Sequence, residues 1–140
     1  MAVSMGDVAE TVSPEDLVHR RRLGVPALRT LDEVRPALEQ TGLQWGPTGS
    51  VGFELATGVP TATEDSDLDL LVRLPRLTPE VLASLAALHE LFGQQSARID
   101  CQVETFYGAA ALAEVMAGRP DILMKTGAGP TLVSRAVALS

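Results

Sequence analysis

Apolar and polar residues alternate most regularly in the stretch LDLLVRL, which runs from Leu68 to Leu74. Side chains two residues apart in a strand point to the same side. The pattern therefore predicts a strand that buries one face and exposes the other, with Asp69 and Arg73 on the exposed face. Three further segments are predicted as strands: Leu43–Pro47, Ala97–Val103 and Ile122–Lys125.

Segments with helical spacing separate these strands. Thr78-Pro79-Glu80 is a helix-start signal, and the apolar run after it ends at Gly93. A capping box at Thr30–Glu33 predicts another helix, although Pro36 implies that this helix begins later or is kinked. Four more helices are expected: a short one from Ser13–Asp16, one over VGFELAT closed by Gly58, one over Tyr107–Ala117, and one over Thr131–Leu139.

Strands that alternate with helices predict an α/β (α+β) fold, a small mixed β-sheet with flanking helices. We expect residues 1–25 to form an N-terminal segment, a loose end followed by the short helix, and residues 26–140 to form one domain. The short helix carries the run Arg20–Arg22, which we interpret as a solvated face. A phosphate or partner contact is the alternative for this run.

Composition narrows the function classes. A chain of 140 residues that is 46% hydrophobic can bury one core, and its net charge of -7 disfavours nucleic acid as a partner. Aromatic residues make up only 4%, which argues against a base-stacking surface. The lone cysteine, Cys101, fits a reducing compartment. The chain has no apolar run of transmembrane length and no signal-peptide pattern, so we expect a cytoplasmic protein without a membrane partner.

Acidic residues mark the candidate site. Asp67 and Asp69 would lie on one strand face with their Cα atoms roughly 6.6 Å apart, where two carboxylates repel each other unless a cation lies between them. Mg²⁺ prefers such oxygen ligands. Asp100, on the next predicted strand, would add the third carboxylate of a site for two metal ions. The alternative is a solvated strand face kept soluble by acids.

Two further segments offer contacts to phosphate. Gly49-Ser50 precedes a predicted helix, so Ser50 would cap that helix while backbone N–H groups receive phosphate oxygens. A simple helix cap is the alternative. Lys125 ends an apolar strand and would reach phosphate from there, with Thr126 shaping the same pocket. A surface lysine followed by a plain turn is the alternative for this pair.

The order of these features resembles the DNA-polymerase-beta-like nucleotidyltransferase superfamily: a strand, Gly-Ser, a helix, Asp-x-Asp on a strand, then Asp on a further strand. The gap from Ser50 to Asp67 is somewhat long for it. Four segments in order also resemble a narrower family, the phosphoribosyl-dephospho-CoA transferases that prime the acyl carrier protein of malonate decarboxylase. These segments are WGPTGSVGFELATG, SDLDLLVR, IDCQVET and KTGAGPTLV, within about Pro26 to Val133.

The resemblance implies that residues 26–140 form a nucleotidyltransferase catalytic domain. The expected reaction moves a nucleotide group from triphosphoribosyl-dephospho-CoA to a serine of the carrier protein and releases pyrophosphate. Asp67, Asp69 and Asp100 would be the catalytic acids and would hold Mg²⁺, with Mn²⁺ as a substitute. The family usually has an additional N-terminal domain before WGPTGS, where this chain has only about forty residues.

Two other interpretations stay open. In the first, the fold and chemistry are kept but the acceptor is a small molecule, an RNA or another protein. In the second, the domain is a non-catalytic, nucleotide-binding regulatory module.

Overall fold

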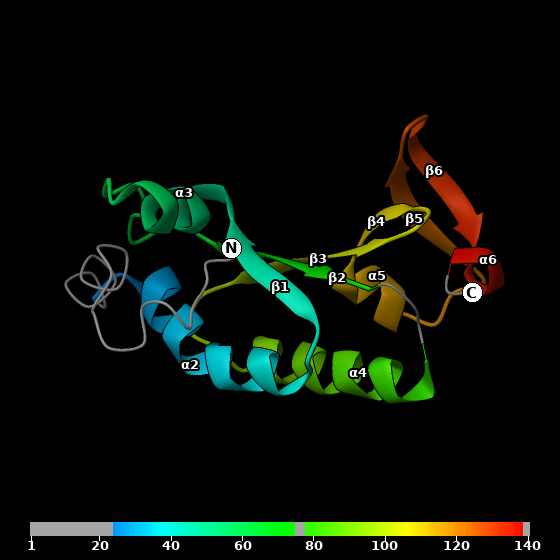
Figure 1. The fold of residues 1–140 in the computed structure, drawn as a ribbon, viewed down its shortest axis with the longest axis horizontal. Helices are drawn as coiled ribbons and strands as arrows, with labels where there is room; N and C mark the ends of the chain where they lie inside the picture. Colours follow the sequence, from blue (N-terminus) through cyan, green and yellow to red (C-terminus); the bar gives the residue numbers. More distant parts are fainter. Residues whose placement is uncertain (1–23, 75–77, 139–140) are drawn as a thin grey trace.

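The strands form one six-stranded sheet in which spatial order follows chain order, from β1 to β6 (Figure 1). The computed structural model describes residues 24–74 and 78–138. Its strands are β1 Gln44–Thr48, β2 Leu68–Arg73, β3 Ile99–Thr105, β4 Gly108–Ala111, β5 Asp121–Thr126 and β6 Gly129–Ser134. Neighbouring strands are antiparallel except β2 and β3, which run parallel.

Five described helices complete the fold: α2 Pro26–Gln40, α3 Gly49–Thr57, α4 Pro79–Gly93, α5 Leu112–Met116 and α6 Arg135–Ala138. Figure 1 shows α2 and α4 along the same side of the sheet, and the two helices contact each other. α4 connects β2 to β3, which is the kind of crossover that parallel neighbours require. α3 follows β1 directly and contacts β1 and β2.

The hydrophobic core explains why β2 alternates. Leu68, Leu70 and Val72 are buried, while the side chains between them are partly or fully exposed. The helices supply the other side of this core. Its helical members include Leu28, Leu31, Val34 and Leu38 of α2 and Leu85, Leu88 and Phe92 of α4. The predicted fold class, a small mixed sheet with flanking helices, is confirmed.

Two helix predictions had different outcomes. α4 begins as expected, because the Thr78 hydroxyl accepts a hydrogen bond from the Val81 N–H at 3.1 Å. α2 begins earlier than expected, with Pro26 in its first turn, where proline is favoured because its missing N–H is not needed. Thr30 is therefore not a cap; it is buried inside the helix, which continues through Pro36.

The helices predicted over Tyr107–Ala117 and Thr131–Leu139 were wrong over their first halves, which form β4 and β6. Each of these strands follows a two-residue turn closed by a threonine. The Thr105 hydroxyl accepts from the Tyr107 N–H at 3.1 Å and donates to the Gly108 carbonyl at 3.1 Å. Thr126 makes the same two bonds within its own turn. Pairing with a neighbouring strand thus outweighs local helical preference in both places.

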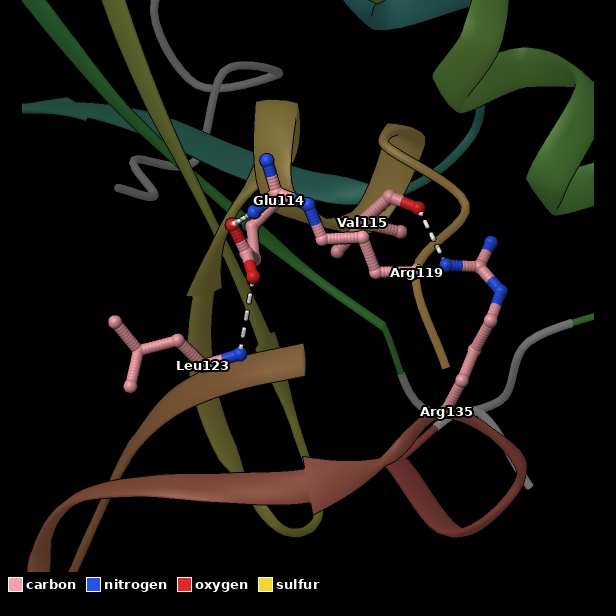
Figure 2. Close-up of polar contacts among 5 residues, drawn as sticks. All are labelled: Glu114, Val115, Arg119, Leu123 and Arg135. Atoms are coloured by element: carbon pink, nitrogen blue, oxygen red, sulfur yellow. Dashed lines mark hydrogen bonds and ion pairs between the residues drawn. The ribbon is translucent and has the colours of Figure 1, made fainter. Parts of the chain in front are cut away.

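Side chains of the C-terminal half attach the β5–β6 hairpin to α5, as Figure 2 shows. Glu114 accepts a hydrogen bond from the Leu123 N–H at 3.3 Å and forms an ion pair with Arg119 at 3.5 Å. Arg135 donates to the carbonyl oxygen of Val115 at 2.8 Å. These contacts join α5 to β5 and to the start of α6.

The short helix predicted from Ser13, with its run Arg20–Arg22, lies outside the described residues. The division of the chain after residue 25 therefore stays a prediction. Among residues 24–74 and 78–138, no helix combines the length and the apolar character needed to cross a membrane.

We predict that Thr78→Ala lowers the free energy of unfolding by about 1 kcal/mol, because the Val81 N–H loses its side-chain acceptor at the start of α4. Urea denaturation followed by circular dichroism measures the change. Thr78→Ser keeps the hydroxyl and serves as the control. Equal losses in both variants would show that the hydroxyl is not the stabilising group.

Candidate active site

Three residues line up across the first three strands. Thr48, the last residue of β1, is paired with Asp69 of β2, and Asp69 is paired with Asp100 of β3. Because β2 and β3 are parallel, both aspartates lie near the start of their strands, about 4.8 Å apart in the backbone. Asp67 directly precedes β2. The structure thus brings together the three acids predicted from the sequence, here called the acid cluster.

The acid cluster is electrostatically strained. Burial, the Asp100 carboxylate and the Asp67 carboxylate, in that order, raise the pKa of Asp69 above its ordinary value of 3.8. Gln102 donates one hydrogen bond to Asp100 at 3.3 Å. Within residues 24–74 and 78–138, no Lys, Arg or His side chain forms an ion pair with any of the three acids. Among the described residues, the cluster therefore carries negative charge that no ion pair offsets, which favours a bound cation.

Gly49 brings the start of α3 directly against Asp69. Its φ of +60° is left-handed, a conformation that glycine adopts without penalty. A Cβ atom built at this position would overlap the Oδ2 atom of Asp69 and lie 3.0 Å from its Cγ. Only glycine fits this contact. The predicted Gly-Ser turn therefore lies beside the acid cluster, as expected.

Ser50 lies in the first turn of α3 but does not cap it, which corrects that part of the prediction. The N-cap residue is Thr48, in an extended conformation, and it forms no side-chain cap hydrogen bond. The backbone N–H groups of this first turn are therefore not used by a capping side chain. Such N–H groups, at the positive end of the helix dipole, are suited to bind phosphate oxygens.

Lys125 and Thr126 are not brought to the acid cluster. Lys125 is paired with Ala109 of β4, and Ala109 is paired with Glu104 of β3. Glu104 lies four residues, or roughly 13 Å, along β3 from Asp100. The Thr126 hydroxyl belongs to the β5–β6 turn described above. A phosphate contact by these two residues stays an untested prediction, and their position does not favour it.

A depression of about 540 Å³ lies beside the acid cluster, between the end of α4, the start of β3 and the start of α5. Asp100, Arg98 and His89 are among its polar lining residues, and Phe92 and Leu112 are among its apolar ones. Sequence reasoning missed Arg98, although its spacing of two residues from Asp100 was a usable signal. This arginine lines the depression together with Asp100.

Cys101 is a core residue, as interpreted from the sequence. It is buried, and burial together with the Asp100 carboxylate raises the pKa of its thiol to about 12. A thiol with this pKa stays protonated at neutral pH, and only the thiolate is strongly nucleophilic. Cys101 is therefore not a nucleophile in the folded protein at neutral pH.

The acid cluster fits a metal ion that is shared with a substrate. Within the described part of the chain, no three His, Cys, Asp or Glu side chains converge closely enough to hold an ion by themselves. Asp69 and Asp100 are paired across β2 and β3, and no described Lys, Arg or His side chain forms an ion pair with them. Mg²⁺ commonly takes one or two carboxylates and completes its shell with water and substrate phosphates. This donor set suits such an open site better than a closed cage.

We predict that Gly49→Ala destabilises the fold by about 1–2 kcal/mol, because alanine is strained at positive φ and its Cβ would displace Asp69. Thermal unfolding measures the loss. Gly46→Ala is the matched control, since a Cβ there meets nothing within 4 Å. A Gly49→Ala protein as stable as the Gly46→Ala protein would contradict this packing.

We predict that Asp100→Asn lowers the pKa of Asp69 toward 3.8, because one of the neighbouring carboxylates is removed. Carbon-detected NMR titration of the Asp69 carboxyl measures it. A raised pKa means that the folded state holds this proton more tightly than the unfolded state. The resulting stability is fully present below pH 3.8 and is lost as pH rises through the raised value.

Without divalent cations, Asp100→Asn should therefore lose less stability than the unsubstituted protein over that pH range. Asp65→Asn, in the exposed part of the preceding loop, is the control. An Asp69 pKa that does not move in Asp100→Asn would show that the two carboxylates do not interact.

Comparisons with known proteins identify relatives of this chain. The family model described as "Phosphoribosyl-dephospho-CoA transferase MdcG C-terminal domain" matches residues 15–136. Relatives named phosphoribosyl-dephospho-CoA transferase include one from Pseudomonas putida, 42% identical over 91% of this chain and 62% of the relative. One from Pseudomonas aeruginosa is 46% identical over 78% of this chain and 51% of the relative.

A third relative of the same name, from Azotobacter vinelandii, is 42% identical over 90% of this chain and 61% of its own length. The chain thus spans between half and about three-fifths of the length of these relatives. No solved structure matches it. The resemblance inferred from the four sequence segments is confirmed, and the chain belongs to the family of the phosphoribosyl-dephospho-CoA transferase MdcG C-terminal domain.

Proposed function

We propose that this domain catalyses a metal-dependent nucleotidyl transfer: a phosphoribosyl-dephospho-CoA group moves from a triphosphoribosyl donor to a serine of the malonate decarboxylase acyl carrier protein. The observation that carries the proposal is the pairing of Asp69 with Asp100 beside the start of α3. The name of the relatives, phosphoribosyl-dephospho-CoA transferase, supports the identity of the transferred group. The carrier-protein acceptor and the release of pyrophosphate rest on the family resemblance.

In the proposed reaction the serine Oγ attacks the phosphorus atom nearest the ribose. A new P–O bond forms, and the P–O bond to the outgoing pyrophosphate breaks, so the product is a phosphodiester. The serine proton passes to a carboxylate, for which Asp100 is our candidate because it is exposed at the edge of the depression. Asp69 is the strand partner of Asp100, and Asp67 lies two residues before Asp69.

Asp67, Asp69 and Asp100 would hold Mg²⁺, or Mn²⁺ in its place, together with water and the phosphate oxygens of the substrate. The ion would supply positive charge where the transferred phosphate and the pyrophosphate develop negative charge. The first-turn N–H groups at Gly49 and Ser50 would orient phosphate oxygens against the acid cluster. Arg98, at the depression beside Asp100, would add a protein cation to the same region.

We predict that Asp69→Asn lowers the transfer rate at least about 100-fold, because the charge nearest both Gly49 and Asp100 is removed. The assay incubates the protein with Mg²⁺, triphosphoribosyl-dephospho-CoA and the carrier protein. Mass spectrometry then measures the mass gained by the carrier. Chelation of the metal should stop the reaction in the unsubstituted protein as well.

Glu104→Gln is the matched control, since Glu104 is on the same strand but at its other end, where it pairs with Arg73 at 2.9 Å. It should transfer at the unsubstituted rate. Unchanged turnover in Asp69→Asn would contradict the metal-dependent mechanism. Consumption of the donor without a mass gain of the carrier would instead indicate a different acceptor. Candidate small molecules, RNA and proteins can then take the place of the carrier protein in the assay.

A further inference from the structure

Glu54 of α3 is a charged side chain with no exposed surface. Burial of a carboxylate is unfavourable unless hydrogen bonds replace the lost water. The Oε1 atom of Glu54 accepts two such bonds, from the Thr61 N–H at 2.7 Å and from the Ala62 N–H at 3.0 Å. Both donors belong to the backbone of the segment that leads from α3 to β2. Two of the hydrogen bonds that this buried carboxylate accepts therefore hold one loop.

This loop comprises residues 58–67. Most of its residues are exposed, and Ala62 is the one that enters the core. Beyond Ala62 the chain forms a local turn, in which the Ser66 hydroxyl accepts from the Thr63 N–H at 2.8 Å and the Ser66 N–H donates to the Thr63 carbonyl at 3.1 Å. Asp67 is the next residue. The path from Glu54 to Asp67 is thus defined by hydrogen bonds at each end.

We propose that Glu54 is a positioning residue for the acid cluster. Its bonds fasten the loop that carries Asp67 to the same helix that carries Gly49 and Ser50. The two halves of the site, the start of α3 and the start of β2, are therefore held together by one buried carboxylate. The proposal deepens the proposed function and rests on it for the role of Asp67.

The same contact accounts for the long spacing between Ser50 and Asp67. A longer loop can let the acid drift from the helix, because its ends are joined by more freely rotating bonds. The hydrogen bonds that Glu54 accepts from the middle of the loop divide the loop into two short, constrained parts. The charge of Glu54 strengthens these bonds relative to a neutral acceptor.

Glu54→Gln tests the proposal, because it keeps the shape of the side chain but removes the charge. We expect hydrogen exchange at the Thr61 and Ala62 amides to rise about tenfold, while exchange in α4 stays unchanged. The turnover number should fall with little change in KM for the donor. The matched control is Glu114→Gln. It also removes a carboxylate that accepts a hydrogen bond from a backbone N–H, but the donor, Leu123, lies in β5.

A titration with Mn²⁺ alone gives a readout that does not depend on activity. Glu54→Gln should weaken Mn²⁺ binding about tenfold, but should have no further effect in an Asp67→Asn background, because the two changes then act on the same contact. Thr61→Pro, which removes one N–H donor and leaves the core carboxylate intact, should reproduce the effect if Glu54→Gln does not fold.

Faster exchange throughout α4 would overturn the proposal, since Glu54 would then stabilise the core in general. A looser loop with unchanged Mn²⁺ affinity would also overturn it, as would an unsubstituted protein that binds no Mn²⁺. A protein that shows the expected Mn²⁺ pattern but transfers nothing to the carrier protein would support the role of Glu54 and contradict the proposed acceptor.

Discussion

β2 and β3 run parallel in a sheet whose other neighbours are antiparallel, because α4 returns the chain along the sheet before β3 begins. Both strands consequently start at the same end, and Asp69 and Asp100 become partners. An antiparallel hairpin would place the start of one strand beside the end of the other and separate these acids by the length of the strand. The apolar face that holds α4 against the sheet is therefore also what assembles the charged site.

The core thus stabilises the acid cluster, in which the neighbouring carboxylates repel each other. Partial burial and two neighbouring carboxylates raise the pKa of Asp69, and Gly49 approaches it without a side chain between them. The apolar contacts of Leu68 and Leu70 on the opposite face hold β2 in place despite this repulsion. Strain of this kind is typical of functional sites, since a bound cation and substrate can relieve it.

Local patterns predicted the parts of the fold that local chemistry controls. The alternation around Leu70 and the cap at Thr78 were sufficient to predict β2 and α4. These two elements place Asp100 beside Asp69, because α4 makes β2 and β3 parallel neighbours. The position of Lys125 could not be predicted, because it depends on the register of β4 and β5, which no short stretch of sequence encodes. Glu54 was missed for a related reason: an acid in a short helix appears solvated until the loop that covers it is known.

Each group of the site comes from the first residues of an element: Gly49 and Ser50 begin α3, Asp69 lies near the start of β2, and Asp100 lies near the start of β3. Backbone at such points is held by the core, while the side chains lie outside it. The loops that precede these points then decide the geometry of the acids. Among the described loops, only the one that leads to Asp67 is long and largely exposed. The buried carboxylate of Glu54 accepts two hydrogen bonds from the backbone of this loop. The hydrogen bonds to Glu54 thereby fix the position of an exposed loop, as strand pairing fixes the positions of Asp69 and Asp100.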